Sequence, residues 1–382
     1  MIGENDKMIY LDNAATTFPK PDLVLDYVNW VQRNCAVNIG RGSYKLAQEA
    51  VQISDKAKIK FAEFVHANSA NDVVFTPSAT IAANEIIYGL EWDALKNVYV
   101  TPFEHNAIMR PLEMMREHFG ISIYTLPFDK DTQELDSDEM NRLFSLNNPD
   151  YVFINQVSNV TGAIIPVKDI GRAAHDYGAT VVVDGSQSVG IIEIDLKKEP
   201  IDFLIFAGHK NLYASWGIGG FVINSVKTIK PMLAGGTGSN SLDMRMDGYE
   251  VGSPNIIAIA SLEKALDWIN SIGIQNIVSH KRVLTRRLIE GLEECGVELY
   301  VPLNTDMHTS VVSFNIPDYE STEVGMILDQ DFGIAVRTGY HCAPLIHKLI
   351  GTEEKKGTVR VSVSYFNSKN DIDELIDAVK NI

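Results

Sequence analysis

Short apolar runs alternate with amphipathic segments along the first two thirds of the chain. Residues 181–183 and 203–206 are two such runs, rich in β-branched and aromatic side chains, and a polar turn closes each. Residues 46–65 and 167–177 have the spacing of amphipathic helices. Because strands that alternate with helices form mostly parallel sheets covered on both faces, this pattern predicts a large α/β domain. Further strands are expected at residues 73–76, 98–101, 121–126, 151–155 and 220–224.

The pattern changes after residue 254. Two long amphipathic helices precede a mixed set of strands and a closing helix, at residues 256–270, 277–295, 311–316, 335–337, 359–364 and 371–380. This order is typical of a smaller α+β domain. A chain of 382 residues also exceeds the size at which one core stops growing. The sequence therefore predicts an N-terminal arm of residues 1–20, a large domain of residues 21–254 and a small domain of residues 255–382.

Charge and cysteine content narrow the class of protein. The net charge of −17 argues against nucleic acid or an anionic membrane surface as a partner. The chain has neither the pattern of a signal peptide nor an apolar run long enough for a membrane span. Its cysteines, Cys35, Cys295 and Cys342, are odd in number and widely separated, which favours a reducing compartment. We therefore expect a cytoplasmic protein.

Two of the predicted strands each deliver a polar side chain to the same edge of the sheet. Asp184 ends the run 181–183, and Lys210 follows the run 203–206. Ligands bind at the carboxyl ends of such strands. A desolvated lysine can form a Schiff base, and an acid can keep a pyridine nitrogen protonated, so the pair meets the needs of pyridoxal phosphate. A surface lysine and a helix-capping aspartate are the structural alternatives.

A phosphate site and a stacking group have weaker signals. Ser78, Ala79 and Thr80 open a predicted helix, where backbone N–H groups and the helix dipole favour an anion. The same residues would also occur at an ordinary helix N-cap that binds no anion. His105 follows a strand and could stack on a planar cofactor, although a single histidine is more often structural.

The polar loop around Cys342 is the candidate for sulfur chemistry. Arg337 and His341 lie close to Cys342 in the sequence and would favour its thiolate. His341, Cys342 and His347 match no strong zinc spacing, so we expect no metal. Arg360 interrupts an apolar strand, which is costly unless it pairs with a carboxylate; that carboxylate could belong to a ligand or to the protein.

Motifs along nearly the whole chain support a family resemblance. They occur at residues 10–16 (YLDNAAT), 104–106 (EHN), 157–162 (VSNVTG), 183–187 (VDGSQ), 208–210 (GHK) and 337–342 (RTGYHC). With these motifs the chain resembles the class V, fold type I, pyridoxal-phosphate enzymes, and among them the cysteine desulfurase and selenocysteine lyase family of short-loop type. The resemblance implies a mostly parallel seven-stranded sheet in the large domain and an N-terminal arm at the active site.

The resemblance also implies roles in binding pyridoxal 5′-phosphate. Lys210 would hold the cofactor aldehyde, Asp184 would pair with the pyridine nitrogen, and His105 would stack on the ring. Asn159 and Gln187 would face the phenolic oxygen. Thr80, the backbone of Ala79 and His209 would hold the phosphate. The resemblance also implies a homodimer with shared active sites, in which Ser253 would reach the phosphate of the neighbouring subunit.

The reaction implied is the conversion of L-cysteine to L-alanine. Arg360 would bind the substrate α-carboxylate with Asn13 and Arg337 nearby, Lys210 would remove the α-proton, and Cys342 would take the sulfur as a persulfide. The sulfur would then pass to an acceptor such as a protein. Two positions depart from the family pattern: Ala207, where a hydroxyl often faces the phosphate, and Gly40, where histidine is common in the short-loop type.

Three hypotheses follow from these residues. The first is a cysteine desulfurase that uses Cys342. The second keeps the cofactor but changes the reaction, to that of a selenocysteine lyase, another C–S lyase or an aminotransferase. The third is a non-catalytic scaffold or sulfur-carrier partner that retains the fold.

Overall fold

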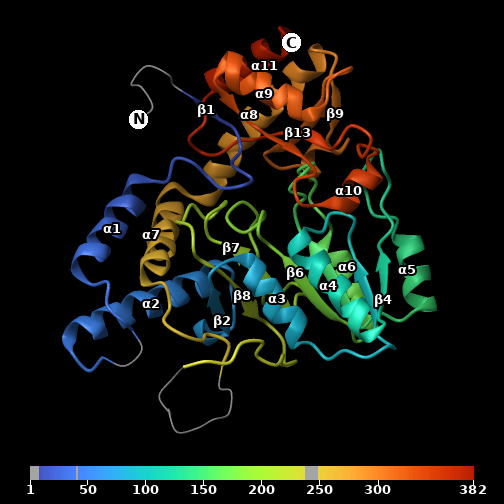
Figure 1. Ribbon diagram of the computed structural model, residues 1–382. Coiled ribbons are helices and arrows are strands. Elements are labelled where there is room, and N and C mark those ends of the chain that lie inside the picture. The colour runs from blue at the N-terminus through green and yellow to red at the C-terminus, as the bar shows by residue number, and fades with distance from the viewer. Residues whose placement is uncertain (1–7, 40–41, 237–247) are drawn as a thin grey trace.

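A seven-stranded sheet and a smaller four-stranded sheet organise the protein (Figure 1). The computed structural model describes residues 8–39, 42–236 and 248–382. The large sheet has the order β2-β8-β7-β6-β5-β3-β4, and β8 alone runs against its neighbours. Its strands are β2 (Val73–Thr76), β3 (Asn97–Val100), β4 (Ser122–Thr125), β5 (Tyr151–Asn155), β6 (Thr180–Asp184), β7 (Phe203–Ala207) and β8 (Gly219–Ile223). The seven-stranded, mostly parallel sheet is therefore confirmed.

Alternate side chains of the sheet enter two separate apolar cores. Val181 and Val183 pack on one face, while Val182 packs on the other. This division follows from the two-residue period of a strand, and it explains why the buried strands read as continuous apolar runs. The helices that surround the sheet are α1 (Asp22–Asn34), α2 (Lys45–Phe64), α3 (Ala79–Gly89), α4 (Asn106–Phe119), α5 (Ser137–Leu146), α6 (Val167–Asp176) and α7 (Ile256–Ile272).

The C-terminal part of the chain forms its own core on a four-stranded antiparallel sheet of order β12-β13-β10-β9. The N-terminal strand β1 (Ile9–Tyr10) joins this part of the molecule, because it pairs in parallel with β11 (Ile334–Ala335). The remaining elements are α8 (Ile274–Glu294), β9 (Glu298–Tyr300), β10 (Val311–Asn315), α9 (Ser321–Phe332), β12 (Arg337–Gly339), α10 (Pro344–Leu349), β13 (Thr358–Ser362) and α11 (Lys369–Lys380), with short 3₁₀ turns at Ala70–Asp72 and Thr305–Met307.

Helix α7 connects the two parts. Leu262 and Leu266 of α7 belong to the core of the large sheet, whereas Leu284 and Leu288 of α8 belong to the core of the small sheet. The domain boundaries expected at residues 20 and 254 stay predictions. Among the described residues, none of the helices combines the length and the apolar character needed to cross a bilayer.

One predicted strand is two strands in the structure. The expectation of a single strand at 335–337 was wrong, since β11 ends at Ala335 and β12 begins at Arg337. The two belong to different sheets: β11 pairs with β1, and β12 pairs with β13. The chain therefore changes direction at Val336, and Arg337 lies directly opposite Arg360 in the small sheet.

Candidate active site

The carboxyl ends of β6 and β7 bring Asp184 and Lys210 to one edge of the large sheet. The two strands are parallel, with Asp184 opposite Ile205, and Lys210 follows the end of β7 by three residues. Asp184 is buried, and its Oδ1 accepts a hydrogen bond from the Ser186 N–H at 2.9 Å. An acid and an amine therefore meet at the edge where α/β sheets bind ligands.

Lys210 has an amine that can exchange a proton near neutral pH. Burial lowers its pKa to about 8; Asp184 raises the pKa, while Arg360 and Arg337 lower it further and Cys342 raises it slightly. An amine with this pKa is partly neutral under physiological conditions and can act as a nucleophile or a base. The same interactions join residues of both sheets in one electrostatic environment.

His105 is a neutral imidazole at the N-cap of α4. It caps the helix, and its Nδ1 accepts a hydrogen bond from the Ala107 N–H at 3.0 Å. Burial lowers its pKa to about 4, and the charge of Lys210 adds to the effect. Because Nδ1 is an acceptor, the ring proton lies on Nε2.

The neighbouring Glu104 is a fully buried carboxyl group. Its Oε1 accepts hydrogen bonds from Thr101 Oγ1 at 2.6 Å and from the Asn155 N–H at 2.7 Å, but Oε2 has no partner among the described residues. Burial raises its pKa to about 8, with Asp184 contributing to the increase. Glu104 is therefore protonated at neutral pH.

The start of α3 forms a cradle of backbone N–H groups. Ser78 caps the helix by accepting a hydrogen bond from the Ile81 N–H, and Ala79 and the exposed Thr80 follow it. A Cβ atom added at Gly219 would lie 2.7 Å from the Ala79 nitrogen, so only glycine allows β8 to pass this close. The first N–H groups of a helix lack intrahelical partners and can bind an anion.

His209 lies in the turn between β7 and Lys210. Its ring stacks on Trp216, with ring centroids 4.1 Å apart and an interplanar angle of 19°. Burial lowers its pKa to about 3, so the ring is neutral, and its buried Nδ1 has no partner among the described residues. The N-terminal arm holds the same turn, because Lys20 Nζ and Thr16 Oγ1 both donate to the His209 carbonyl oxygen.

The loop that carries Cys342 has a strained backbone. His341 and Cys342 both have positive φ, at 49° and 59°. Arg337 Nη2 lies 3.5 Å from Cys342 Sγ, so the two side chains are in contact. The expected influence of His341 was wrong, because its Nε2 lies 3.0 Å from both oxygens of Thr358 and its deep burial holds its pKa well below the usual value. Arg337 is therefore the cation at the sulfur.

Asn159 and Gln187 both use one amide hydrogen to hold a neighbouring segment. Asn159 Nδ2 donates to the His341 carbonyl oxygen at 2.7 Å, and Gln187 Nε2 donates to the Ala14 carbonyl oxygen at 2.8 Å. Each NH₂ group has a second hydrogen that can still be donated. The two amides therefore tie the Cys342 loop and the N-terminal arm to the large sheet.

Arg360 is only 1% exposed and binds both the arm and the large domain. Its Nη2 donates to Asp12 Oδ1 at 2.6 Å, and its Nη1 donates to the Asn159 carbonyl oxygen at 3.0 Å. Asn13, which lies in the arm, is also occupied: its Nδ2 donates to the Ser362 carbonyl oxygen in β13, and its Oδ1 accepts from the Phe18 N–H. The carboxylate expected beside Arg360 is thus supplied by the protein's own Asp12.

Ser253 is hydrogen-bonded to a different segment of the chain. Ser253 is exposed, and its Oγ accepts a hydrogen bond from Asn38 Nδ2 at 3.0 Å. Gly40, one of the two departures from the family pattern, lies outside the described residues. The other departure, Ala207, is buried at the end of β7 and has no hydroxyl to offer.

The sequence model of the aminotransferase class-V family matches residues 9–375. The chain belongs to this family. Probable cysteine desulfurases of Pyrococcus abyssi and Methanothermobacter thermautotrophicus are 31% and 33% identical to it, and each alignment covers 98% of this chain and 94% of the relative.

Solved structures agree with this assignment to the class V family. The apo structure of the cysteine desulfurase from Thermococcus onnurineus NA1 has a TM-score of 0.90 and 31% identity. The cysteine desulfurase CsdA of Escherichia coli, in its S-sulfonic acid form, has a TM-score of 0.85 and 27% identity. Both comparisons cover 98% of this chain and 94% of the other.

The site fits pyridoxal phosphate, the group that class V enzymes generally use. Asn159 Oδ1, Ser186 Oγ and His209 Nδ1 are buried without partners among the described residues, and all three belong to segments next to Asp184 or Lys210. An unsatisfied buried polar atom costs about 1–3 kcal/mol, so several of them in one site indicate a polar ligand. The backbone cradle beside Gly219 offers a separate place for its phosphate.

Sequence reasoning missed three residues of this class V site. Asp12 pairs with Arg360, Trp216 stacks on His209, and Glu104 is a protonated acid beside His105. Asp12 had the clearest signal, because it lies in the motif YLDNAAT beside Asn13. Trp216 had none, since a loop tryptophan does not reveal the ring on which it stacks.

Proposed function

We propose that this protein is a pyridoxal-phosphate-dependent cysteine desulfurase that converts L-cysteine to L-alanine and holds the sulfur as a persulfide on Cys342. The observation that carries the proposal is the contact between Arg337 and Cys342, 3.5 Å from Nη2 to Sγ, in the electrostatic environment that also contains Lys210. Attack on the substrate sulfur requires a thiolate, whose negative charge the Arg337 guanidinium would pair with. The cysteine desulfurases named among the relatives support the same reaction.

In this proposal the cofactor is held by the residues around Lys210 and Asp184. Lys210 would bind the aldehyde, Asp184 the pyridine nitrogen, and the neutral ring of His105 one face of the cofactor. Asn159 and Gln187 would donate their second amide hydrogens to the phenolic oxygen; Ala79, Thr80 and His209 would hold the phosphate. When bound, pyridoxal phosphate supplies an electron sink that stabilises negative charge at the substrate Cα.

Lys210, Arg337 and Arg360 would have different roles toward the substrate. Arg360 binds the α-carboxylate, and Arg337 and Asn13 line the same side of the site. Lys210, as the neutral amine that its pKa of about 8 allows, removes the proton from Cα. Cys342 Sγ then attacks the substrate Sγ, so that an S–S bond forms as the Cβ–Sγ bond breaks. Returned protons complete L-alanine, and the persulfide passes to an acceptor.

The proposal also covers the oligomeric state and the cellular location of the protein. We infer a homodimer in which Ser253 reaches the phosphate of the neighbouring subunit. Leu23, Tyr27 and Trp30 form a stripe along α1, in which Tyr27 and Trp30 stack and Trp30 is 51% exposed; a second copy of the chain would cover such a stripe. Three free cysteines are consistent with the cytoplasm. A sulfur-acceptor protein completes the proposed partners.

The decisive experiment incubates the purified protein with L-cysteine and with L-selenocysteine and measures alanine, released chalcogenide and the mass of Cys342. A desulfurase yields alanine and an extra sulfur on Cys342. The Cys342→Ser variant should retain the absorbance of the bound cofactor but form no persulfide. Turnover that survives in Cys342→Ser would favour a selenocysteine lyase, another C–S lyase or an aminotransferase. A scaffold would show no cofactor absorbance sensitive to Lys210→Ala.

A further inference from the structure

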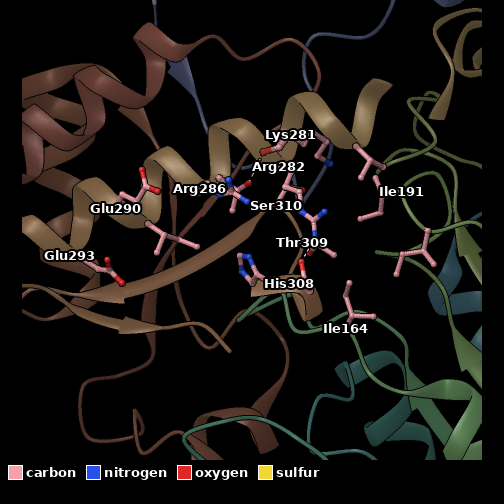
Figure 2. Close-up of a pocket in the computed structure, with 15 residues that line it drawn as sticks. Ile164, Ile191, Lys281, Arg282, Arg286, Glu290, Glu293, His308, Thr309 and Ser310 are labelled. Atoms are coloured by element: carbon pink, nitrogen blue, oxygen red, sulfur yellow. Dashed lines mark hydrogen bonds and ion pairs between the residues drawn. The ribbon is translucent and has the colours of Figure 1, made fainter. Parts of the chain in front are cut away.

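A cavity of about 350 Å³ lies away from the proposed active site, between helix α8 and the large domain (Figure 2). This volume is at the lower end of the range of small-molecule pockets, about 300–1,000 Å³. Five aliphatic side chains line it, and all are partly exposed: Ile164, Ile191, Ile192, Val278 and Ile289. A concave surface of this composition suits a small aliphatic group.

A buried lysine, Lys281, also lines the cavity. Its side chain is 3% exposed, and its Nζ donates to Asn211 Oδ1 at 2.7 Å. Within residues 8–39, 42–236 and 248–382, no carboxylate forms an ion pair with it. A lysine ammonium has three hydrogens to donate, and a buried charge is costly without a counter-ion. Burial lowers the pKa of Lys281 to about 7, so it is readily neutralised and readily recharged by an anion.

The other charged groups of the cavity do not neutralise Lys281. Arg282 pairs with Asp306 at 3.0 Å, and Arg286 is exposed, with neither a hydrogen bond nor an ion pair to any described residue. Figure 2 shows Glu290 and Glu293 at the opposite end of the cavity from Lys281. Glu290 comes nine positions after Lys281 in the helix, which corresponds to roughly 13 Å along the axis.

His308 is the remaining titratable group of this cavity. Its Nε2 lies 2.8 Å from the Val311 carbonyl oxygen, and burial lowers its pKa to about 4, so it is neutral near pH 7. The cavity therefore has a cationic end at Lys281 and an aliphatic wall, which side chains of the large domain and of α8 form. A doubly charged phosphate would need several buried donors, whereas a single buried amine beside aliphatic side chains suits a monoanion.

We propose that this cavity is a binding site for a small aliphatic monocarboxylate, with the carboxylate paired to Lys281 and the hydrocarbon chain against Ile164, Ile191 and Ile192. The site would be coupled to the active site. Lys281 bonds to Asn211, the residue after Lys210, and Asn211 Nδ2 in turn donates to the Gln187 carbonyl oxygen at 2.7 Å. An anion on Lys281 would change the charge beside this hydrogen-bond chain. Only this coupling rests on the proposed function of Lys210.

Calorimetric titration with octanoate tests the binding, with octanamide and propionate as matched probes. Octanoate should bind, whereas octanamide, which lacks the charge, and propionate, which lacks the chain, should each bind at least about tenfold more weakly. The affinity for octanoate should fall above pH 7, by up to about tenfold per pH unit, as Lys281 loses its proton. Equal binding of octanoate and octanamide, or no binding of octanoate at millimolar concentration, would overturn the proposal.

Two variants locate the site. Lys281→Met retains the aliphatic stem and should weaken octanoate binding at least about tenfold, while the exposed Lys130→Met should leave it unchanged. If Lys281→Met fails to fold, Ile191→Glu places a carboxylate at the cationic end and should abolish binding. Unchanged affinity in the variant that folds contradicts the assignment.

The coupling has a separate readout. In the cofactor-loaded protein, octanoate should shift the pH midpoint of the cofactor absorbance band in the wild type but not in Lys281→Met. Binding without such a shift overturns the coupling and leaves the carboxylate site intact. Failure of the desulfurase assay would leave the calorimetric binding test unaffected, and the absorbance readout requires only that the cofactor is bound through Lys210.

Discussion

Glu104 illustrates how a single residue can retain a proton that its chemistry would normally release. Burial holds the pKa of this carboxyl group at about 8 in the folded protein, whereas in the unfolded chain its pKa has the ordinary value of 4.5. Between these two values the unfolded state binds fewer protons than the folded state. The contribution of Glu104 to stability is therefore fully present below pH 4.5 and is lost as the pH rises to 8.

The Glu104→Gln variant should remove this pH dependence. Glutamine keeps the acceptor for Thr101 and Asn155 but cannot ionise. Relative to the wild type, the variant should therefore gain stability from pH 5 to pH 8, by up to about 1 kcal/mol per pH unit. Urea unfolding across this pH range measures the difference. Glu117→Gln, at an exposed position, should show no such trend; the same flat profile in Glu104→Gln would show that Glu104 is already ionised in the fold.

A substitution of Arg360 tests whether this single residue contacts the substrate. The Arg360→Lys variant keeps the charge but loses the planar fork that can bind a carboxylate through two nitrogens. Because one fork atom, Nε, is buried without a described partner, we expect the KM for L-cysteine to rise about 10–100-fold. The matched control is Arg142→Lys, which removes an exposed bidentate pair with Glu139 and should leave the KM unchanged. An unaltered KM in Arg360→Lys would assign Arg360 to structure alone.

At the scale of elements, β8 sets the width of the proposed phosphate cradle. It passes so close to the start of α3 that a Cβ at Gly219 would lie within 2.9 Å of Ser78, Ala79 and Phe206 backbone atoms. The Gly219→Ala variant must therefore displace α3 or β8. Overpacking of this kind costs about 1–3 kcal/mol, so pyridoxal phosphate should bind about 10–100-fold more weakly. Cofactor titration measures the loss. Gly236→Ala, where a Cβ meets no atom within 4 Å, should bind normally.

The secondary-structure elements differ in how well the sequence predicts them. The apolar runs at 181–183 and 203–206 carry their own signal, because buried strands need continuous apolar residues, and so Asp184 and Lys210 could be assigned to one sheet edge. Helix α9 lacked such a signal. Gly325 interrupts its pattern, and the reason is tertiary: a Cβ there would lie 2.5 Å from the Thr338 side chain.

The active site depends on pairings between distant segments, and these could not be predicted. Asp12 and Arg360 are 348 residues apart, and they meet because β1 pairs with β11 and Asp12 then forms a parallel bridge with Ser362 of β13. No local pattern encodes such a pairing. Arg360 itself could be singled out, since an arginine in an apolar strand requires a partner, but the identity of that partner is a property of the folded chain.

At the scale of the whole molecule, the proposed dimer makes a prediction that a monomer cannot satisfy. If Ser253 serves the neighbouring subunit, each active site combines Lys210 of one protomer with Ser253 of the other. Lys210→Ala removes the amine, and Ser253→Asp places a negative charge where the phosphate would bind. Homodimers of either variant should therefore be inactive.

A purified heterodimer with one Lys210→Ala protomer and one Ser253→Asp protomer should regain about half of the wild-type rate per dimer. One of its sites carries both substitutions, and the other has Lys210 and Ser253 intact. Differently tagged protomers allow this species to be isolated and assayed for alanine. If each protomer instead used its own Ser253, both sites would carry one substitution and the heterodimer would be inactive. A heterodimer that binds one cofactor and has half the activity would therefore establish that the sites are shared.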